Sequence, residues 1–443
     1  MSLILGLKHK ETDSLLIELG TEAIRVVLFS VRKNHDQVTE VILKGESEKQ
    51  LEVPSGFLDP LLSKIHTEMS FSSGSEDVLP ISVFKETIRQ AIFEAMPVRI
   101  PQGYNKSSLE DLLSIVDKVT IILSPALAKS RVDSLVFARK DSNLSIGEKE
   151  EIEIQSWLKD EISKKVGEYS MTIGLLPEEI IPIDLKIEEI KIDGYFVNYL
   201  AGYSGKTIEF KIISAMIFAH YLAEIKSIFE NPKINSKRTI KITHSGAVLG
   251  PLIKEKKVNG ILMDIQERWT QVFIADNGMI TDIIDINCGN RCFCRAIEDR
   301  LGLSENEANR LKEEYIERKL SESARERIHI IIAETADRWF AKINQQMAMT
   351  NVAGNNSEVV NKLFFNKILL FGRGANLDEL KTVIENNWQK LSVSTPSVTV
   401  IGPQTIAGWL IDIGSQTRYK GLTGRMSGIK DVKTLFSILY DLS

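Results

Sequence analysis

An acid, a glycine and a hydroxyl stand together directly after an apolar run near the start of the chain. Glu18, Gly20 and Thr21 follow the run 15–17, and a second apolar run begins two residues after Thr21. A continuously apolar run is typical of a strand buried on both faces, so the stretch predicts a β-hairpin whose turn spans 18–22. Its tip is either a plain turn or a phosphate loop. In a phosphate loop, backbone amides and the Thr hydroxyl hold an oxyanion, and the acid holds a hydrated Mg²⁺.

The same arrangement of residue types returns in the second half of the chain. The stretch 258–289 predicts a strand, a turn, a second strand, an Asn-Gly turn and a third strand. Asp264 takes the place that Glu18 has in the first hairpin, and Thr270 stands six residues after it. Two acids at equivalent hairpin tips would face each other across a cleft and share one hydrated Mg²⁺. The repeated opening implies two related α/β halves.

A glycine-rich turn follows another buried strand at 369–377. Gly372 and Gly374 let the backbone approach a ligand closely, although a Gly-x-Gly alone fits an ordinary strand-to-helix turn equally well. Three such loops in this order along one chain favour a nucleotide site.

The composition excludes several classes of protein. A length of 443 residues allows two or more domains, and a net charge of −5 with a pI near 5.9 argues against a nucleic-acid partner. No apolar run approaches the ~18 residues of a membrane span, and the start lacks a signal-peptide layout. Cys288, Cys292 and Cys294 suit neither a disulfide framework nor a four-ligand zinc site. We therefore expect a cytoplasmic protein.

Hydrophobic periodicity predicts the elements that position these loops. Helices are expected at 83–95, 109–116, 216–229, 291–301, 304–315 and 322–349, and strands at 38–44, 118–124 and 239–245. The texture changes between 130 and 213, where several strand-like runs and an acidic helix predict a small α+β module. We expect the segment 203–210 of this module to lie on an exposed strand edge, where it would pair with another chain.

The order of the loops resembles the actin-like ATPase superfamily. The matching motifs are an acid-Gly-Thr hairpin at 18–21, an Asp-led hairpin at 264, an adenosine loop at 372–375 and a closing Ala-Gly pair at 407–408. Within the superfamily the chain is most similar to FtsA, the bacterial division protein, and to its relative PilM of type IV pili. The stretch 289–315, which contains Lys312, resembles the FtsA segment after the second hairpin. The stretch 192–212 resembles FtsA's extra subdomain. The resemblance covers most of the chain, except about 46–110 and the last 25 residues.

This resemblance implies an α/β protein with an actin-like fold. Two related α/β halves would surround a nucleotide cleft, and a small α+β subdomain of the SHS2-like kind would be inserted in the first half. The expected parts are 1–129 for the start of half I with an insertion at about 46–110, 130–213 for the subdomain, 214–257 for the completion of half I, 258–415 for half II and 416–443 for a C-terminal tail.

The resemblance also implies ATP and Mg²⁺ as cofactors. Glu18 and Asp264 would position the metal through water. The residues expected to contact the nucleotide are Gly20, Thr21, Thr270, Lys312, Gly372, Gly374, Ala375 and Gly408. Three positions depart from the family pattern, because Glu18 replaces an Asp, Gln266 replaces a Gly and Arg373 replaces a Gly. Gln266 would crowd the γ-phosphate, and no catalytic base stands out, so we expect at most a weak ATPase.

The expected function is a nucleotide-binding cytoskeletal adaptor that resembles FtsA. It would polymerise and link tubulin-like division filaments to the inner face of the cell membrane of a bacterium. A PilM-like adaptor that binds an inner-membrane protein of a type IV pilus or secretion machine is the alternative, and a small-molecule kinase of the superfamily is the third. The tail segment 429–442 carries one apolar helical face, which either docks on the protein itself or binds the membrane surface.

Overall fold

The computed structural model describes residues 10–20, 23–34, 37–51, 81–96, 113, 116–125, 127–172, 174–229, 239–353, 367–388 and 396–402. They form two compact units, which divide between Leu252 and Ile253, and unit 2 ends at Gly402. Several predictions lie outside the described residues: Thr21, most of the helix 109–116, the closing Ala407-Gly408 pair and the whole tail 416–443. No helix in the described ranges is long and apolar enough to cross a membrane.

Unit 1 contains a five-stranded mixed sheet with the order β3-β2-β1-β4-β9. Its strands are β1 (Lys10–Leu19), β2 (Ala23–Asn34), β3 (Gln37–Gln50), β4 (Lys118–Leu123) and β9 (Thr239–His244). The first three are joined as antiparallel hairpins, and β4 and β9 continue the sheet in parallel with β1. Helix α2 (Ile81–Ala95) packs against β3 so closely that a methyl group on Gly45 would collide with the Ala95 carbonyl. Helix α6 (Ser245–Glu255) follows β9.

Unit 2 contains a second sheet with the same layout, in the order β12-β11-β10-β13-β14. Its strands are β10 (Gly260–Ile265), β11 (Thr270–Asp276), β12 (Met279–Ile286), β13 (Lys367–Phe371) and β14 (Ser397–Val400). Antiparallel hairpins again lie on one side of the first strand and parallel strands on the other. The prediction of two related α/β halves is therefore confirmed, and β10 in unit 2 is the counterpart of β1 in unit 1.

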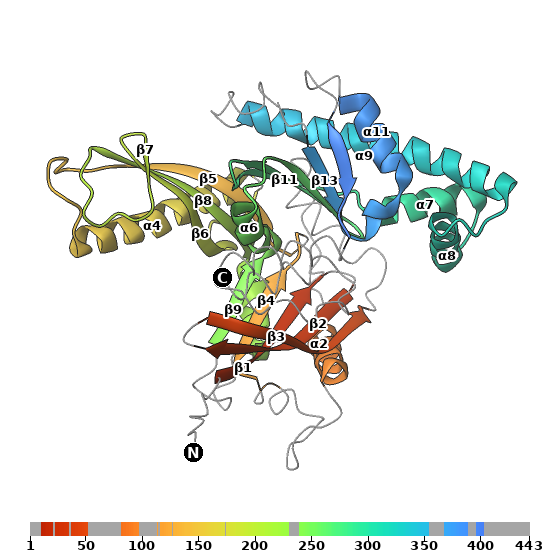
Figure 1. Ribbon diagram of the computed structural model, residues 1–443, viewed down its shortest axis with the longest axis horizontal. Coiled ribbons are helices and arrows are strands. Elements are labelled where there is room, and N and C mark those ends of the chain that lie inside the picture. Colours follow the sequence, from red (N-terminus) through yellow and green to blue (C-terminus); the bar gives the residue numbers. More distant parts are fainter. Residues whose placement is uncertain are drawn as a thin grey trace, which may run out of the picture. The chain divides into compact units, whose positions relative to one another are not determined.

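Four helices of unit 2 complete its core. They are α7 (Asn290–Leu301), α8 (Glu305–Ile316), α9 (Glu322–Ala353) and α11 (Asp378–Trp388). The long helix α9 runs past α7 and α11 (Figure 1), and its Trp339 is fully buried in the core against the sheet. The start of α8 matches the sequence prediction, because Ser304 and Glu307 form a capping box that satisfies the free amides of the first turn.

A smaller α+β module is inserted in unit 1 between β4 and β9. It consists of β5 (Lys129–Ala138), α4 (Glu148–Thr172), β6 (Ile180–Ile192), β7 (Tyr195–Val197) and β8 (Thr207–Phe218). Helix α4 lies along one face of its sheet (Figure 1), and α5 (Ala219–Phe229) leads back towards β9. The presence of an inserted α+β module agrees with the prediction, whereas its SHS2-like identity remains an expectation.

Two details of the module prediction were wrong. Strand β8 continues to Phe218, so residues 216–218 are not helical. The strand order β5-β8-β6-β7 places β8 inside the sheet, because its residues pair with β5 on one side and β6 on the other. The part of 203–210 that forms a strand therefore has no free edge, and the edges of the sheet belong to β5 and β7.

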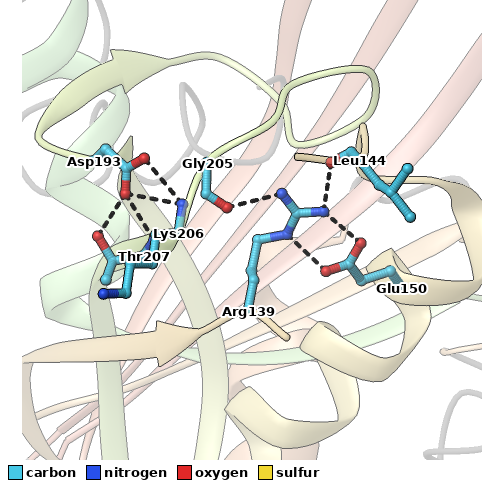
Figure 2. A network of polar contacts seen from close by, with 7 residues as sticks. All are labelled: Arg139, Leu144, Glu150, Asp193, Gly205, Lys206 and Thr207. Carbon is cyan, nitrogen blue, oxygen red and sulfur yellow. Dashed lines mark hydrogen bonds and ion pairs between the residues drawn. The ribbon is translucent and has the colours of Figure 1, made fainter. Parts of the chain in front are cut away.

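A buried arginine joins the loops at the far end of the module (Figure 2). The Arg139 guanidinium donates two hydrogen bonds, of 2.7 and 2.8 Å, to the carboxylate of Glu150 at the start of α4. It also donates to the carbonyl oxygens of Leu144 and Gly205, both at 2.9 Å. The Glu150 carboxylate neutralises the charge of Arg139, and the hydrogen bonds to the two carbonyls attach the loops that contain Leu144 and Gly205 to the arginine. The end of the module is therefore a rigid unit.

An aspartate fixes the neighbouring loop in the same way. The Asp193 carboxylate accepts hydrogen bonds from the backbone amides of Lys206 and Thr207 and from the Thr207 hydroxyl (Figure 2). These hydrogen bonds lower the pKa of Asp193. The turn between β6 and β7 is thereby tied to the start of β8.

Candidate functional site

In unit 1, Glu18 lies within the sheet rather than at a hairpin tip. Strand β1 continues to Leu19, β2 begins at Ala23, and the Gly20 backbone amide donates to the Ala23 carbonyl at 3.1 Å, so the predicted turn at 18–22 began too early. The Glu18 carboxylate lies 3.6 Å from the guanidinium of Arg25, its partner across the hairpin. The same guanidinium contacts Glu48 at 2.8 Å. Glu18 is therefore already balanced by a cation of the protein.

In unit 2, Asp264 occupies the equivalent position, one residue before the end of β10. Its side chain is almost completely enclosed, with 2% of the residue exposed. The side-chain amide of Gln266 donates a 2.6 Å hydrogen bond to one carboxylate oxygen. The other oxygen faces Gly372, where an added methyl carbon would lie only 2.7 Å from it. Asp264 thus lies between the Gln266 side chain and the glycine-rich turn.

The turn that carries Gln266 also closes the start of α7. The backbone N–H of Gln266 donates to the Trp269 carbonyl at 2.8 Å. Gly20 makes the equivalent hydrogen bond to the residue three positions later in unit 1. The carbonyls of Gln266 and Glu267 accept hydrogen bonds from the amides of Asn290 and Arg291, both at 2.7 Å. Two free amides of the α7 N-terminus are thereby satisfied by the protein and are not directed at a phosphate.

Lys312 on α8 forms the centre of a buried polar cluster. Its ammonium group donates to the Asn290 side-chain oxygen at 2.8 Å and to the Cys294 sulfur at 3.1 Å, and 3% of the residue is exposed. The Asn290 amide in turn donates to the Glu267 carboxylate at 2.9 Å. Burial raises the pKa of the Cys294 thiol, so the neutral thiol is favoured beside the ammonium group. The sequence prediction found Lys312 but missed Asn290, whose only signal is its place directly after a Cys-Gly pair.

The glycine-rich turn lies against the same cluster. Gly372 has a φ of 90°, a conformation that favours glycine, and precedes the short 3₁₀ helix η1 (Arg373–Asn376). An added methyl carbon on Gly374 would lie 2.4 Å from the Ile265 side chain and 3.3 Å from the Asn290 Cβ atom. The buried Ala375 amide donates to the Gly372 carbonyl at 3.2 Å. The turn and the Lys312 cluster therefore share Asn290 as a neighbour.

These residues meet where two parallel strands end. Asp264 on β10 is in register with Phe371 on β13, and the residue after Phe371 is Gly372. The strand order reverses between these two strands, the kind of position where α/β sheets bind ligands. Of the predicted site residues, unit 2 brings together Asp264, Lys312, Gly372, Gly374 and Ala375.

Thr270 has a different environment from the one expected of a phosphate ligand. Its hydroxyl donates to the Cys288 carbonyl at 2.7 Å and accepts from the Trp339 indole at 2.9 Å, and the residue is fully buried. A phosphate contact would require the hydroxyl to give up one of these partners. In this structure Thr270 joins strand β11 to helix α9.

The two acids do not fit a hydrated Mg²⁺ well, because Glu18 is paired with Arg25 and Asp264 is enclosed and bonded to Gln266. In the described ranges, no group of three or more His, Cys, Asp or Glu side chains is arranged to hold a metal ion. The glycine-rich turn packs closely against Ile265, and the Lys312 cluster places a buried cation and the Asn290 amide beside it.

Comparison with known proteins gives a likeness of fold. No protein-family model and no curated protein sequence matches the chain. Among solved structures, a PilM–PilN type IV pilus biogenesis complex matches with a TM-score of 0.55 and 11% identity, over 97% of this chain and 98% of that chain. A MamK double helical filament matches with a TM-score of 0.39 and 10% identity, over 88% and 94% of the two chains. MreB 5 of Spiroplasma citri bound to AMPPNP matches with a TM-score of 0.38 and 9% identity, over 88% and 91%.

The first of these matches is the informative one, since it exceeds a TM-score of 0.5 and extends over nearly the whole of both chains. At 11% identity it bears on the fold and not on the activity. It agrees with the two sheets of equivalent strand order. The chain has the actin-like ATPase fold.

Proposed function

We propose that the chain is an actin-like adaptor that binds an adenine nucleotide in unit 2 and docks a protein of a membrane-bound machine. The observation that carries the nucleotide part is the cluster of Lys312, Asn290 and the turn 372–375 at the ends of β10 and β13. Every member of this cluster belongs to unit 2.

The charge of Lys312 supports a ligand at this position. Among the described residues its partners are the Asn290 amide oxygen and the Cys294 sulfur, and none of the ion pairs involves it. A buried cation whose partners are neutral is costly, and an electron-rich ligand lowers that cost. The hydroxyls and ring nitrogens of an adenosine are suitable acceptors for the ammonium group.

A substitution of Lys312 by Met tests this part of the proposal, because Met retains the length of the apolar stem and lacks the ammonium group. A charge-assisted hydrogen bond contributes about 1.5–3 kcal/mol, so the affinity for ADP in a calorimetric titration should fall roughly ten- to a hundred-fold. The control is Arg310→Ala on the same helix, since Arg310 is exposed and pairs with Glu314 at 3.5 Å. Equal affinities of the Lys312→Met variant and the wild type would contradict the proposal.

For the docking part, a PilM-like role is favoured over the FtsA-like role that the sequence suggested. Support comes from the match of fold over nearly the full length of the matched chain of a PilM–PilN complex, since the motif resemblance is shared by FtsA and PilM. The module also presents aromatic side chains to solvent next to its rigid end, with Tyr195 78% and Phe196 67% exposed. Exposed aromatic side chains in one place are typical of protein interfaces.

Co-expression with candidate partners tests this choice. The chain should co-purify with an inner-membrane protein of a pilus or secretion system from the same organism, and a Phe196→Ser substitution should weaken that association. Co-purification with a tubulin-like division protein instead would favour the FtsA-like role.

Self-polymerisation and membrane binding through 429–442 are part of the same proposal. Electron microscopy tests the polymerisation, and vesicle flotation tests the membrane binding. ATP turnover should remain near background in all these assays.

A further inference from the structure

The Gln266 side chain gives Asp264 the hydrogen bond that, in the family pattern, would come from a water molecule bound to a metal ion. A water molecule bound to Mg²⁺ is a strong hydrogen-bond donor, and an acid that positions the metal through water accepts that hydrogen bond. In this chain the donor is the side-chain amide of Gln266, at 2.6 Å from the Asp264 carboxylate. The acceptor is therefore satisfied by the protein itself.

The position of Gln266 is fixed by its own backbone. Its backbone N–H donates to the Trp269 carbonyl, and its backbone carbonyl accepts from the backbone N–H of Asn290. Both backbone groups of Gln266 are therefore hydrogen-bonded. Gln266 is not among the residues with positive φ, so its side chain causes no backbone strain. With its backbone fixed in this way, Gln266 directs its side-chain amide at Asp264. A glycine at this position would remove this donor from Asp264.

The counterpart acid in unit 1 is also satisfied within the protein, since Glu18 faces Arg25 at 3.6 Å. We propose that Gln266 takes the place of metal-bound water at Asp264, so that this chain binds an adenine nucleotide without a divalent cation. This inference rests on the proposed nucleotide site. Affinity then depends mainly on the nucleoside contacts, and ADP should bind about as tightly as ATP.

The experiment is a calorimetric titration of the full chain with ADP, in excess Mg²⁺ and in excess EDTA. The two affinities of the wild-type protein should agree within about threefold. In the Gln266→Glu variant a carboxylate replaces the donor and stands against Asp264, and a cation between them relieves the repulsion. Binding by this variant should become at least about ten times tighter in Mg²⁺ than in EDTA.

Two further variants make the test specific. Gln90→Glu makes the same change at a second contact of this kind, between Gln90 and Glu86 at 2.8 Å on helix α2 of unit 1, and should leave binding independent of Mg²⁺. Gln266→Gly removes the side chain without adding a charge and should also create a requirement for Mg²⁺. Circular dichroism establishes that each variant is folded before it is titrated.

The outcomes separate this inference from the proposal on which it rests. Wild-type binding that is ten or more times weaker in EDTA would overturn the inference alone. A Gln266→Gly variant that stays independent of Mg²⁺ would overturn it as well, because the amide would then not be the substitute. Absence of ADP binding by the wild type under both conditions would contradict the nucleotide site itself.

Discussion

His244 is a buried titratable residue whose environment favours one charge state. It ends strand β9, is completely enclosed, and its Nδ1 atom lies 2.7 Å from the Ser130 hydroxyl at the start of β5. Burial is the main cause that lowers the pKa of His244 to about 4, and the nearby Lys186 adds to it while Asp184 opposes it. The imidazole is therefore neutral in the folded protein at neutral pH.

This environment predicts a pH dependence of stability. The unfolded chain binds a proton at His244 near pH 6.5, whereas the folded protein does not until about pH 4. Above pH 6.5, His244 therefore does not lower the free energy of unfolding. As the pH falls to 4, proton binding by the unfolded chain at His244 lowers that free energy by about 3 kcal/mol. Urea unfolding between pH 7 and 4.5 should show this loss in the wild type and a flatter profile in His244→Gln. Parallel profiles of the two proteins would show that His244 is not the cause.

Most residues of the unit 2 site could be expected from the sequence, but their contacts could not. Gly372 and Gly374 were recognisable because a Gly-x-Gly turn after an apolar strand allows close backbone approach. The hydrogen bonds of Lys312 with Asn290 and of Gln266 with Asp264 depend on where α7 and α8 lie against the β10–β11 turn. No local pattern specifies that placement. Gln266 was recognised as a departure from the family pattern, but the direction of its side chain was not.

At the scale of elements, the end of the module depends on one ion pair. The Arg139 side chain is fully buried and makes four hydrogen bonds to three residues, including two to Glu150. Because two carbonyls would lose their donor and the partly exposed Glu150 would lose its cation, Arg139→Met should lower the free energy of unfolding by about 2–3 kcal/mol. Thermal unfolding measures this loss.

A surface ion pair on the same module provides the control for this prediction. Lys164 on α4 is exposed and pairs with Glu161 three residues before it at 3.6 Å. Removing it as Lys164→Met should cost no more than about 0.5 kcal/mol. Similar losses for the two variants would mean that Arg139 does not hold the loops together.

Local elements followed from the sequence better than their partners in the sheets did. The capping box at Ser304 and the Asn-Gly hairpin between β11 and β12 depend on neighbouring residues alone, and both were predicted. The central position of β8 depends on pairing with β5 and with β6, which are far from each other in the sequence. Its alternating pattern fits an edge strand as well as an internal one, so the edge prediction failed.

At the scale of the whole molecule, the repeated sheet is what connects sequence to fold. Both sheets begin with an antiparallel hairpin and continue with parallel strands on the other side of the first strand. The sequence reveals this repeat because the first strand of each sheet contains an apolar run that is followed directly by an acid one residue before the strand ends, Glu18 or Asp264. The same repeat places the two acids at equivalent positions, although each is satisfied within its own unit.

The central claim is that an adenine nucleotide binds in unit 2 at the Lys312 cluster and the glycine-rich turn. Hydrogen–deuterium exchange of the full chain with and without ADP tests it most directly, because exchange reports the position of the ligand as well as its presence. ADP should slow exchange at the start of α7, at the end of α8 around Lys312 and at 372–376. Unchanged exchange at these three segments, with or without protection elsewhere, would contradict the account.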